Sequence, residues 1–385
     1  MNNYLNYFIA IVIFSSCNSS QNENLELSKS TPSAIYKIDD SFANIFSWND
    51  KVDVEQIIPL ETSSKSLIVD INKVIINNNN IYILDTRNYN LIVFDQNGKF
   101  IQKIGTIGKG PGEYIEIRDF DISNGFIYTL DYRKIHKYNL NDGKFIETID
   151  LVLDKNDGLN PTNIIAFNDD HYYLWNGNPD VYKPKEKTYF QLFEYKHDKI
   201  VSNYFAYKYK IMDGNRFNKR ASGGYFMLPQ DGEYCIYKID DDNIQNDFKL
   251  DFGKDSIPSE FFNKKHGSEY FNIYLKSKYY KMINQIHELP KNKLYFSCIG
   301  PGSYNYEGLI DRKTEEVYFG KRDFKFSPKI MFSDDKYIYG FYKPHHVVNN
   351  LNQGNSKNQI FEFVKKNVGK IQDTDNFILV KLSIK

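Results

Sequence analysis

The chain has 385 residues, and its 49 lysines and arginines balance its 49 aspartates and glutamates, so no net field draws nucleic acid or an anionic membrane to its surface. Many tyrosines, phenylalanines and asparagines favour short strands joined by polar turns over helices, because aromatics fill half-buried pleated surfaces and asparagine tolerates turn conformations. Length alone leaves two interpretations open: two ordinary domains or one large closed β architecture.

An apolar run near the N-terminus predicts export. The stretch YLNYFIAIVIFSSC contains about ten apolar residues, enough for the core of a signal peptide and too few to span a bilayer. It ends at Cys17 behind two serines, which resembles the lipobox of bacterial lipoproteins, where the cysteine is acylated. We predict a signal peptide over residues 1–16 and a lipidated Cys17 with a flexible polar tether over residues 17–48; the alternative is an ordinary secretory signal cleaved nearby.

The two remaining cysteines are too few for a disulfide framework. Cys235 and Cys298 lie in apolar, strand-like runs, EYCIYKI and LYFSCIG. A buried thiol packs in such a run as a small hydrophobic group, so we predict two thiols rather than one disulfide.

A repeat of about 45 residues organises the next part of the chain. The segment NNNNIYILDTRNYNLIVFDQNGKFIQKIG is followed by ISNGFIYTLDYRKIHKYNLNDGKFIETID, with Ile81 aligned on Ile127 and Asp85 on Asp131. Each copy has a strand ending in Asp, a polar loop, a second strand, an Asn-Gly or Asp-Gly turn and a third strand. This is the antiparallel meander of a propeller blade.

Weaker copies extend the repeat to six blades. They begin near DHYYLWNG, GYFMLPQDGEY, NKLYFSCIG and DDKYIYGFYK, and a partly helical insert over residues 255–281 separates the fourth from the fifth. The sixth copy ends the chain at its third strand, NFILVKLSIK. We therefore predict an all-β, six-bladed propeller of four-stranded antiparallel blades over residues 49–385, closed by the N-terminal segment Val52 to Thr62 as the missing outer strand.

These segments resemble a known family. IYILDTRNYNLIVFDQNGKFIQKIGTIGKGPGEY resembles an NHL-type blade, and together with IIPLET upstream and the lipobox the chain is similar to the six-bladed β-propeller lipoproteins of Bacteroidota. The resemblance is strong over residues 52–150 and continues weakly to the C-terminus. It implies the fold and a place in the cell envelope, as an outer-membrane lipoprotein facing the periplasm or the surface, and it supplies no catalytic residue.

The glycine-rich run GKGPGEY allows two interpretations. A phosphate-binding loop needs a helix after its glycines, but the following IEIRDFDI alternates like a strand. We therefore interpret the run as a wide turn between blades whose glycines adopt positive φ.

Few residues suggest catalysis. The seven histidines show no regular metal-ligand spacing, although a propeller can gather ligands from distant blades in its channel. The adjacent His345 and His346 are expected to be solvated in a loop. Asp85 and Asp131 end their strands at matching positions, which favours turn capping over a catalytic carboxylate pair.

The loops between second and third strands share one face of a propeller with the loops between blades. On these loops we expect a ligand site that combines aromatic and polar groups, formed by Arg87, Tyr89, Arg133, Trp175, Tyr304 and His345. The insert is expected on the same face, either capping the mouth or packed on the side of a blade. The predicted function is an envelope binding module for a protein, peptide or glycan; the alternative is a propeller lyase or hydrolase with a channel metal. We expect a monomer without cofactor or nucleic-acid partner, held to the membrane only by its lipid.

Overall fold

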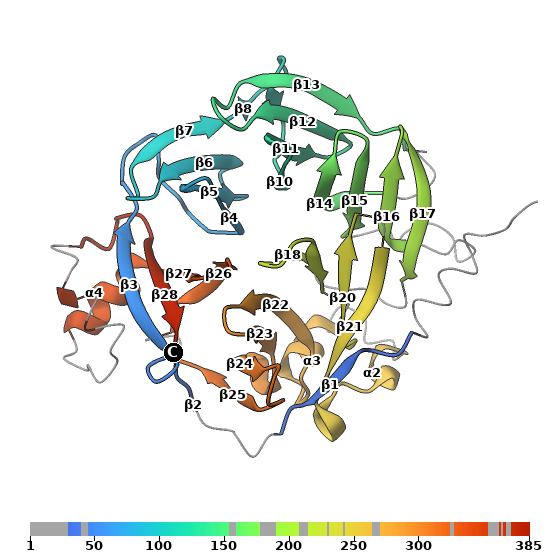
Figure 1. Ribbon diagram of the computed structural model, residues 1–385, viewed down its shortest axis with the longest axis vertical. Coiled ribbons are helices and arrows are strands. Elements are labelled where there is room, and N and C mark those ends of the chain that lie inside the picture. Colours follow the sequence, from blue (N-terminus) through green and yellow to red (C-terminus); the bar gives the residue numbers. More distant parts are fainter. Residues whose placement is uncertain are drawn as a thin grey trace, which may run out of the picture.

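Six antiparallel sheets stand around a common axis and form a closed ring (Figure 1). The predicted six-bladed β-propeller is therefore confirmed. The computed structural model describes residues 30–39, 45–153, 159–177, 190–207, 215–228, 231–241, 243–263, 270–323, 327–352, 362, 365–366 and 371–385. The predicted signal peptide and Cys17 lie outside this part of the chain, and the tether lies partly outside it.

In each blade the first strand lies nearest the axis and the others follow outward. Blade one contains β4 (Lys73–Asn77), β5 (Asn80–Asp85), β6 (Asn90–Asp95) and β7 (Phe100–Ile104). Blade two contains β10 (Asp119–Ser123), β11 (Phe126–Asp131), β12 (Lys134–Asn139) and β13 (Phe145–Asp150). Blade three contains β14 (Pro161–Asn168), β15 (His171–Asn176), β16 (Phe190–Lys196) and β17 (Lys199–Ala206).

The second half of the ring repeats this order. Blade four contains β18 (Phe217–Lys219), β19 (Tyr225–Met227), β20 (Cys235–Asp240) and β21 (Asn243–Asp251). Blade five contains β22 (Met282–Leu289), β23 (Lys293–Ile299), β24 (Asn305–Asp311) and β25 (Val317–Arg322). Blade six contains β26 (Lys329–Ser333), β27 (Ile338–Tyr342), β28 (Ile378–Ile384) and, from the N-terminal part of the chain, β3 (Val52–Pro59).

The strand β3 closes the ring as predicted. It pairs antiparallel with β28 along its length, from Val52 opposite Ile384 to Pro59 opposite Ile378. The last blade therefore combines the two ends of the chain, which removes the open edge that β28 would otherwise present.

Two further N-terminal strands lie in the segment expected to be a tether. Strand β1 (Ala34–Lys37) pairs parallel with β21, and β2 (Ile45–Phe46) pairs parallel with β25. Tyr36, Phe46 and Trp48 are buried in these contacts. The expectation of an unpatterned tether up to residue 48 is wrong for this part, because one aromatic side chain in each short strand is enough to fix it to the outer edge of a blade.

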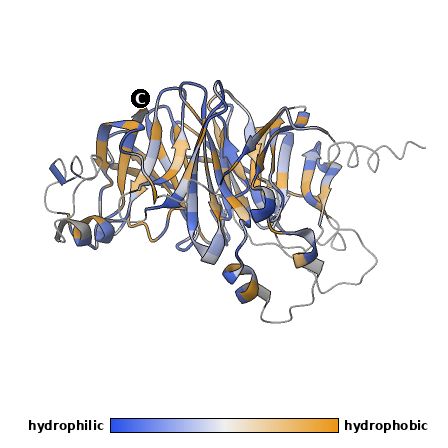
Figure 2. Ribbon diagram, turned by 90° about the horizontal axis from the view of Figure 1, so that it is seen from below, coloured by the Kyte–Doolittle hydropathy of each residue, from blue (hydrophilic) through white to orange (hydrophobic). Residues whose placement is uncertain are grey.

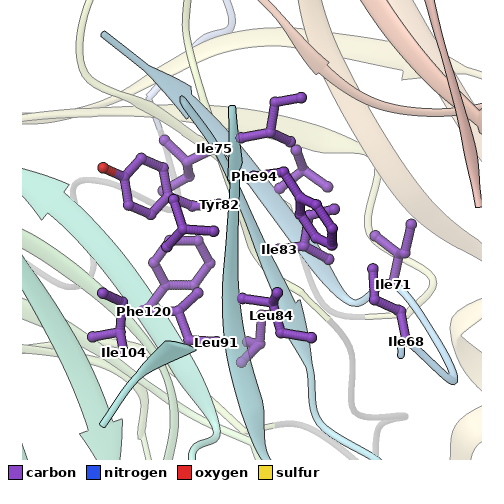
Figure 3. Packing of buried hydrophobic residues seen from close by; sticks show 14 of the residues in the cluster. Ile68, Ile71, Ile75, Tyr82, Ile83, Leu84, Leu91, Phe94, Ile104 and Phe120 are labelled. Carbon is purple, nitrogen blue, oxygen red and sulfur yellow. The ribbon is translucent and has the colours of Figure 1, made fainter. Parts of the chain in front are cut away.

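The core is a ring of apolar layers between neighbouring blades. Tyr82 and Ile83 are adjacent in β5, and Figure 3 shows them on opposite sides of the strand, because successive side chains of a strand point to opposite faces. Tyr82 lies on the side of Phe120 in blade two, and Ile83 lies on the side of Ile68 and Ile71. Both faces of blade one are therefore buried.

The two faces of the ring carry different connections. We call the mouth face the one with the loops between blades and between second and third strands, and the turn face the one with the remaining hairpin turns. The helices of the mouth face are α2 (Ser259–Asn263), α3 (Tyr270–Lys276) and α4 (Pro344–Asn352), with 3₁₀ turns at Gly253–Asp255 and Pro301–Ser303. Figure 2 shows the helices on one side of the ring and the C-terminal end on the other. In the described residues no helix is long and apolar enough to cross a membrane.

The insert between blades four and five is helical, as predicted. The hydroxyl of the buried Tyr274 in α3 donates to Asp231 at 3.0 Å, and the Ser303 hydroxyl donates to the Leu275 carbonyl at 2.6 Å. Because Asp231 and Ser303 belong to loops of blades four and five, α3 is fixed on top of these two blades.

The glycine-rich run forms a closed turn between blades one and two. Short strands β8 (Thr106–Ile107) and β9 (Glu113–Tyr114) pair parallel across it, and the carboxylate of Glu113 accepts the backbone N–H of Gly110 at 2.7 Å. Gly105 and Gly112 have φ of 65° and 75°, as expected for a turn. At Gly108 a Cβ would lie 2.0 Å from the Glu113 carboxylate, so a larger residue there would displace this side chain from the turn. The turn interpretation is confirmed.

The thiol prediction is also confirmed. Cys235 and Cys298 form no disulfide with each other. Cys298 is buried in the layer between blades four and five, and burial raises the pKa of its thiol.

Candidate functional site

A polar pocket of about 460 Å³ opens at the mouth face, above the inner strands of blades one to three. Its walls come from the ends of strands and from the loops that lead into four successive blades. It is lined by Asn72, Lys73, Leu84, Thr86, Tyr89, Glu116, Ile117, Arg118, Asp119, Asn160, Thr162, Asn163 and Asn215. This volume is in the range of small-molecule sites in proteins.

An ion pair lies at the base of the pocket. Lys73 Nζ lies 3.0 Å and 3.2 Å from the two carboxylate oxygens of Asp119, and the residues are 7% and 1% exposed. The same carboxylate accepts the backbone N–H of Ile164 at 2.9 Å. Burial raises the pKa of Asp119, while the Lys73 ammonium and the Ile164 N–H act against that rise. The first residues of inner strands β4 and β10 therefore link blade one to blades two and three.

Arg118 forms one wall. Its Nε lies 3.4 Å from the Glu116 carboxylate, and its guanidinium carbon stands 3.9 Å from the ring centre of Tyr132. Its Nη1 donates to the side chain of Asn160 and to the carbonyl of Pro161. These contacts hold a planar cation in one orientation, and stacking on an aromatic ring stabilises it further.

Five of the six predicted ligand residues lie on the mouth face, namely Arg87, Tyr89, Arg133, Tyr304 and His345, whereas Trp175 is buried. Of these five, Tyr89 lines the pocket, with 37% of its surface exposed. Arg87 is on the same loop, with Nε 3.9 Å from Asp70. Arg133 has a structural role, since its guanidinium donates to the carbonyls of Leu153 and Leu159 in the next interblade loop.

Tyr304 and His345 lie away from the pocket lining. Tyr304 is 49% exposed beside blade five, with Lys321 Nζ 3.0 Å from its ring centre. His345 is exposed at the start of α4, where its ring contacts that of His346. The segment was expected to be a polar loop, and it is a helix beginning at Pro344, a residue suited to the first helical turn.

The assignment of Trp175 to the mouth is wrong. Trp175 is the fifth residue of β15 and is 1% exposed, in the apolar layer between blades three and four. Its ring meets Phe217 edge-on at 6.5 Å, and Arg216 stands 5.5 Å from it. The strand continues further into WNG than the sequence pattern indicated, so the tryptophan packs inside. The rest of the predicted loop WNGNPDVYKPKEK, residues 178–187, lies outside the described residues.

Polar groups cross the central channel. Asp121 in blade two accepts the Tyr225 hydroxyl of blade four at 2.6 Å and the backbone N–H of Ala166 in blade three at 2.9 Å. Lys219 of blade four reaches the carbonyl of Ile122 at 3.0 Å. In the described part of the chain no cluster of three or more His, Cys, Asp or Glu side chains could hold a metal ion.

Sequence reasoning missed most of the pocket. Lys73, Arg118 and Asp119 were visible as charges at the entrance of inner strands, and Lys73 and Asp119 are separated by 46 residues, as are the repeated Asp85 and Asp131. Lys73 and Asp119 therefore occupy the same position of two neighbouring copies, at the start of each inner strand. Opposite charges at this position lie next to each other near the axis, so their spacing could have predicted the ion pair.

Solved structures share this fold. A Bacteroides fragilis protein assigned as exported aligns with a TM-score of 0.74 and 20% identity over 91% of this chain and 99% of its own. A member of the DUF4221 family from Bacteroides vulgatus aligns with a TM-score of 0.54 and 15% identity over 88% of this chain and 99% of its own. At these identities the likeness concerns the fold. A comparison with curated proteins finds no match. Residues 36–383 match the family described as Domain of unknown function (DUF4934), and the chain belongs to this family.

Proposed function

We propose that this chain is an exported, lipid-anchored binding module of the cell envelope whose mouth pocket takes the ligand. The observation that carries the proposal is the pocket itself, where polar side chains from four successive blades converge on one space of about 460 Å³. A closed ring holds such loops in fixed positions, and binding sites are commonly built from loops on a rigid scaffold.

The N-terminal sequence supports export and anchoring. The apolar run that ends at Cys17 has the length of a signal-peptide core, and a relative in fold is assigned as exported. Replacing Cys17 with Ala should move the mature protein from the membrane fraction to the soluble fraction. Unchanged membrane association would contradict the anchor.

The path of β1 suggests how an anchored protein is oriented. Because β1 runs parallel to β21, the chain reaches blade four from the turn face, where the Ser30 carbonyl accepts the side-chain amide of Asn246 at 2.9 Å. Residues 18–29 separate Cys17 from Ser30, and if they form the tether that the sequence predicts, a segment of that length would span about 20 Å on average. The nine residues of β21 extend over roughly 30 Å. An anchor at Cys17 therefore favours a turn face near the bilayer and a pocket open on the far side.

Orientation is measured on the lipidated protein in liposomes. A fluorophore attached at position 314, on the turn face, should be quenched by spin labels in the bilayer more strongly than one at position 86, in the pocket. Stronger quenching at position 86 would reverse the proposed orientation.

Ligand binding is tested with a panel of glycans and peptides, followed by titration calorimetry. Thr86→Trp should fill the pocket and abolish binding of any ligand that the panel identifies. Thr314→Trp is the matched control, since Thr314 is exposed on the turn face. A ligand bound equally by both variants would place the binding site elsewhere.

A further inference from the structure

Three asparagines of the pocket have side-chain amides whose orientation is fixed by the protein. The Oδ1 of Asn72 accepts the backbone N–H of Thr86 at 2.8 Å, and the Oδ1 of Asn215 accepts the backbone N–H of Phe217 at 3.2 Å. The Oδ1 of Asn160 accepts from Arg118 Nη1. Each partner can only donate, so each contact must be made by the amide oxygen.

The consequence is a pocket rich in hydrogen-bond donors. In the described part of the chain the NH₂ groups of Asn72, Asn160 and Asn215 have no hydrogen-bond acceptor, and all three residues line the pocket. None of these nitrogens is among the buried polar atoms without a partner, so they remain accessible to a bound molecule. Each NH₂ group can donate two hydrogen bonds.

The charges of the pocket cancel locally. Lys73 is paired with Asp119 at 3.0 Å, and Arg118 lies 3.4 Å from Glu116. A charged ligand would therefore meet one carboxylate for each cation and gain little from the electrostatics of the site. The geometry favours an uncharged ligand that accepts hydrogen bonds.

Carbohydrate fits this requirement better than peptide. A sugar hydroxyl rotates to accept or to donate, whereas each peptide N–H needs an acceptor, and the amide oxygens of the three asparagines are already used. The half-exposed ring of Tyr89 at the rim offers apolar surface for the carbon face of a sugar. The volume of about 460 Å³ suits one or two sugar units.

We propose that the mouth pocket binds an uncharged carbohydrate, whose hydroxyl and ring oxygens accept hydrogen bonds from the amides of Asn72, Asn160 and Asn215. This inference rests on the proposed binding function and adds the chemical class of the ligand.

The test uses a conservative exchange that reverses the hydrogen-bonding character of the pocket. Asn72→Asp and Asn215→Asp keep an oxygen for the backbone N–H of Thr86 or Phe217 but replace the NH₂ donor with an acceptor. Asn139→Asp is the matched control, because Asn139 Oδ1 also accepts a backbone N–H, from Asn141 at 2.9 Å, on the turn face. Melting curves of all three variants check that the fold is retained.

The probes are neutral oligosaccharides containing mannose, galactose, glucose or N-acetylglucosamine, compared with uronate-containing oligosaccharides and with peptides. We expect binding of a neutral oligosaccharide, weakened about tenfold or more by each pocket variant and unchanged by Asn139→Asp, since tenfold corresponds to one lost hydrogen bond. Equal binding by wild type and both pocket variants would overturn the proposal.

The other outcomes separate this inference from the proposed function. Binding of only peptides or uronates, blocked by Thr86→Trp, would refute the neutral carbohydrate and keep the binding pocket. No binding of any probe class would count against both. A neutral glycan that still binds Thr86→Trp would show that the pocket is not its site.

Discussion

The carboxylate of Asp85 accepts the backbone N–H of Val69 at 2.8 Å, and the two residues are sixteen positions apart. The same link joins Asp131 to Ile115 and Asn176 to Asn160, at the same separation and the same distance of 2.8 Å. In three successive blades the end of the second strand therefore fixes the loop that enters the blade. Since the residues after these loops line the pocket, this link positions its walls.

Asp85→Ala should lower the free energy of unfolding. The buried carboxylate also accepts the backbone N–H groups of Arg87 and Asn88, and all these donors would lose their acceptor. We expect a loss of about 2–4 kcal/mol in urea denaturation. Asp85→Asn should cost less, because blade three uses Asn176 in the same role. Asp150→Ala, at an exposed strand end, should be nearly neutral, and an equal loss there would contradict the argument.

Trp175→Ala should destabilise the protein without a direct effect on binding. Trp175 is completely buried between blades three and four, so its removal leaves a cavity and should cost about 3–5 kcal/mol. Differential scanning calorimetry measures the shift in Tm, with Tyr304→Ala as the control for an exposed aromatic residue. A normal Tm for Trp175→Ala would contradict the stabilising role of this buried ring.

Three N-terminal truncations test how the ring is closed. Removal of residues 1–29 deletes none of the described contacts and should leave Tm unchanged. Removal of residues 1–48 takes away the buried Phe46 and Trp48 and uncovers the outer strands of blades four and five, so the free energy of unfolding should fall by several kcal/mol. Removal of residues 1–62 also opens blade six, and light scattering should then detect aggregation. If the protein without residues 1–48 is as stable as the protein without residues 1–29, strands β1 and β2 contribute nothing to the free energy of unfolding.

Glu194 makes stability depend on pH in the acid range. Burial alone would raise its pKa, but His171 Nε2 at 3.2 Å, the Lys196 ammonium at 2.8 Å and the hydrogen bond from the Tyr204 hydroxyl lower the pKa of Glu194 from 4.5 to about 2. The folded state therefore binds this proton less readily than the unfolded chain, and the stabilisation is complete above pH 4.5 and lost as the pH falls towards 2. It amounts to at most about 3 kcal/mol.

The measurement is urea denaturation of wild type and Glu194→Gln between pH 6 and pH 2. The variant should be less stable at pH 6 and should lose less stability on acidification. Glu147→Gln is the control, since this carboxylate is half-exposed beside Lys137. If Glu194→Gln retains the full acid dependence of wild type, other carboxylates cause it.

The sequence predicted those parts of the fold that repeat. Asp85 and Asp131 occur at one position of two aligned copies, and the capping role inferred from that repetition is what the hydrogen bonds show. Closure by Val52 to Thr62 followed from counting strands, since the last copy lacked one. Both inferences depend only on the order of elements along the chain.

The pocket could not be predicted in the same way. Asn72 and Asn160 stand directly before their inner strands and Asn215 stands two residues before its own, but asparagine is common in the turns of this chain, so these three did not stand out. Their amides acquire a defined direction only through contacts with Thr86, Arg118 and Phe217. The contacts with Thr86 and Arg118 join residues that are 14 and 42 positions apart in the sequence, so they exist only in the folded chain. For Trp175 the error had a different source. The end of the strand was placed before Trp175, whereas the strand continues to Asn176, so the side chain lies in the core instead of on the surface.

Lys73→Met tests whether the ion pair at the base of the pocket supports the ring. The substitution keeps most of the apolar length of the side chain and leaves the Asp119 carboxylate buried without its cation, at an expected cost of about 3–5 kcal/mol in the free energy of unfolding. The double variant Lys73→Met/Asp119→Asn should recover part of this loss, because the Asn oxygen can still accept the N–H of Ile164 and no unpaired charge remains. Lys134→Met breaks the exposed pair with Asp150 and should change stability by less than about 1 kcal/mol. If the double variant is no more stable than Lys73→Met, an unpaired buried charge is not the cause of the loss.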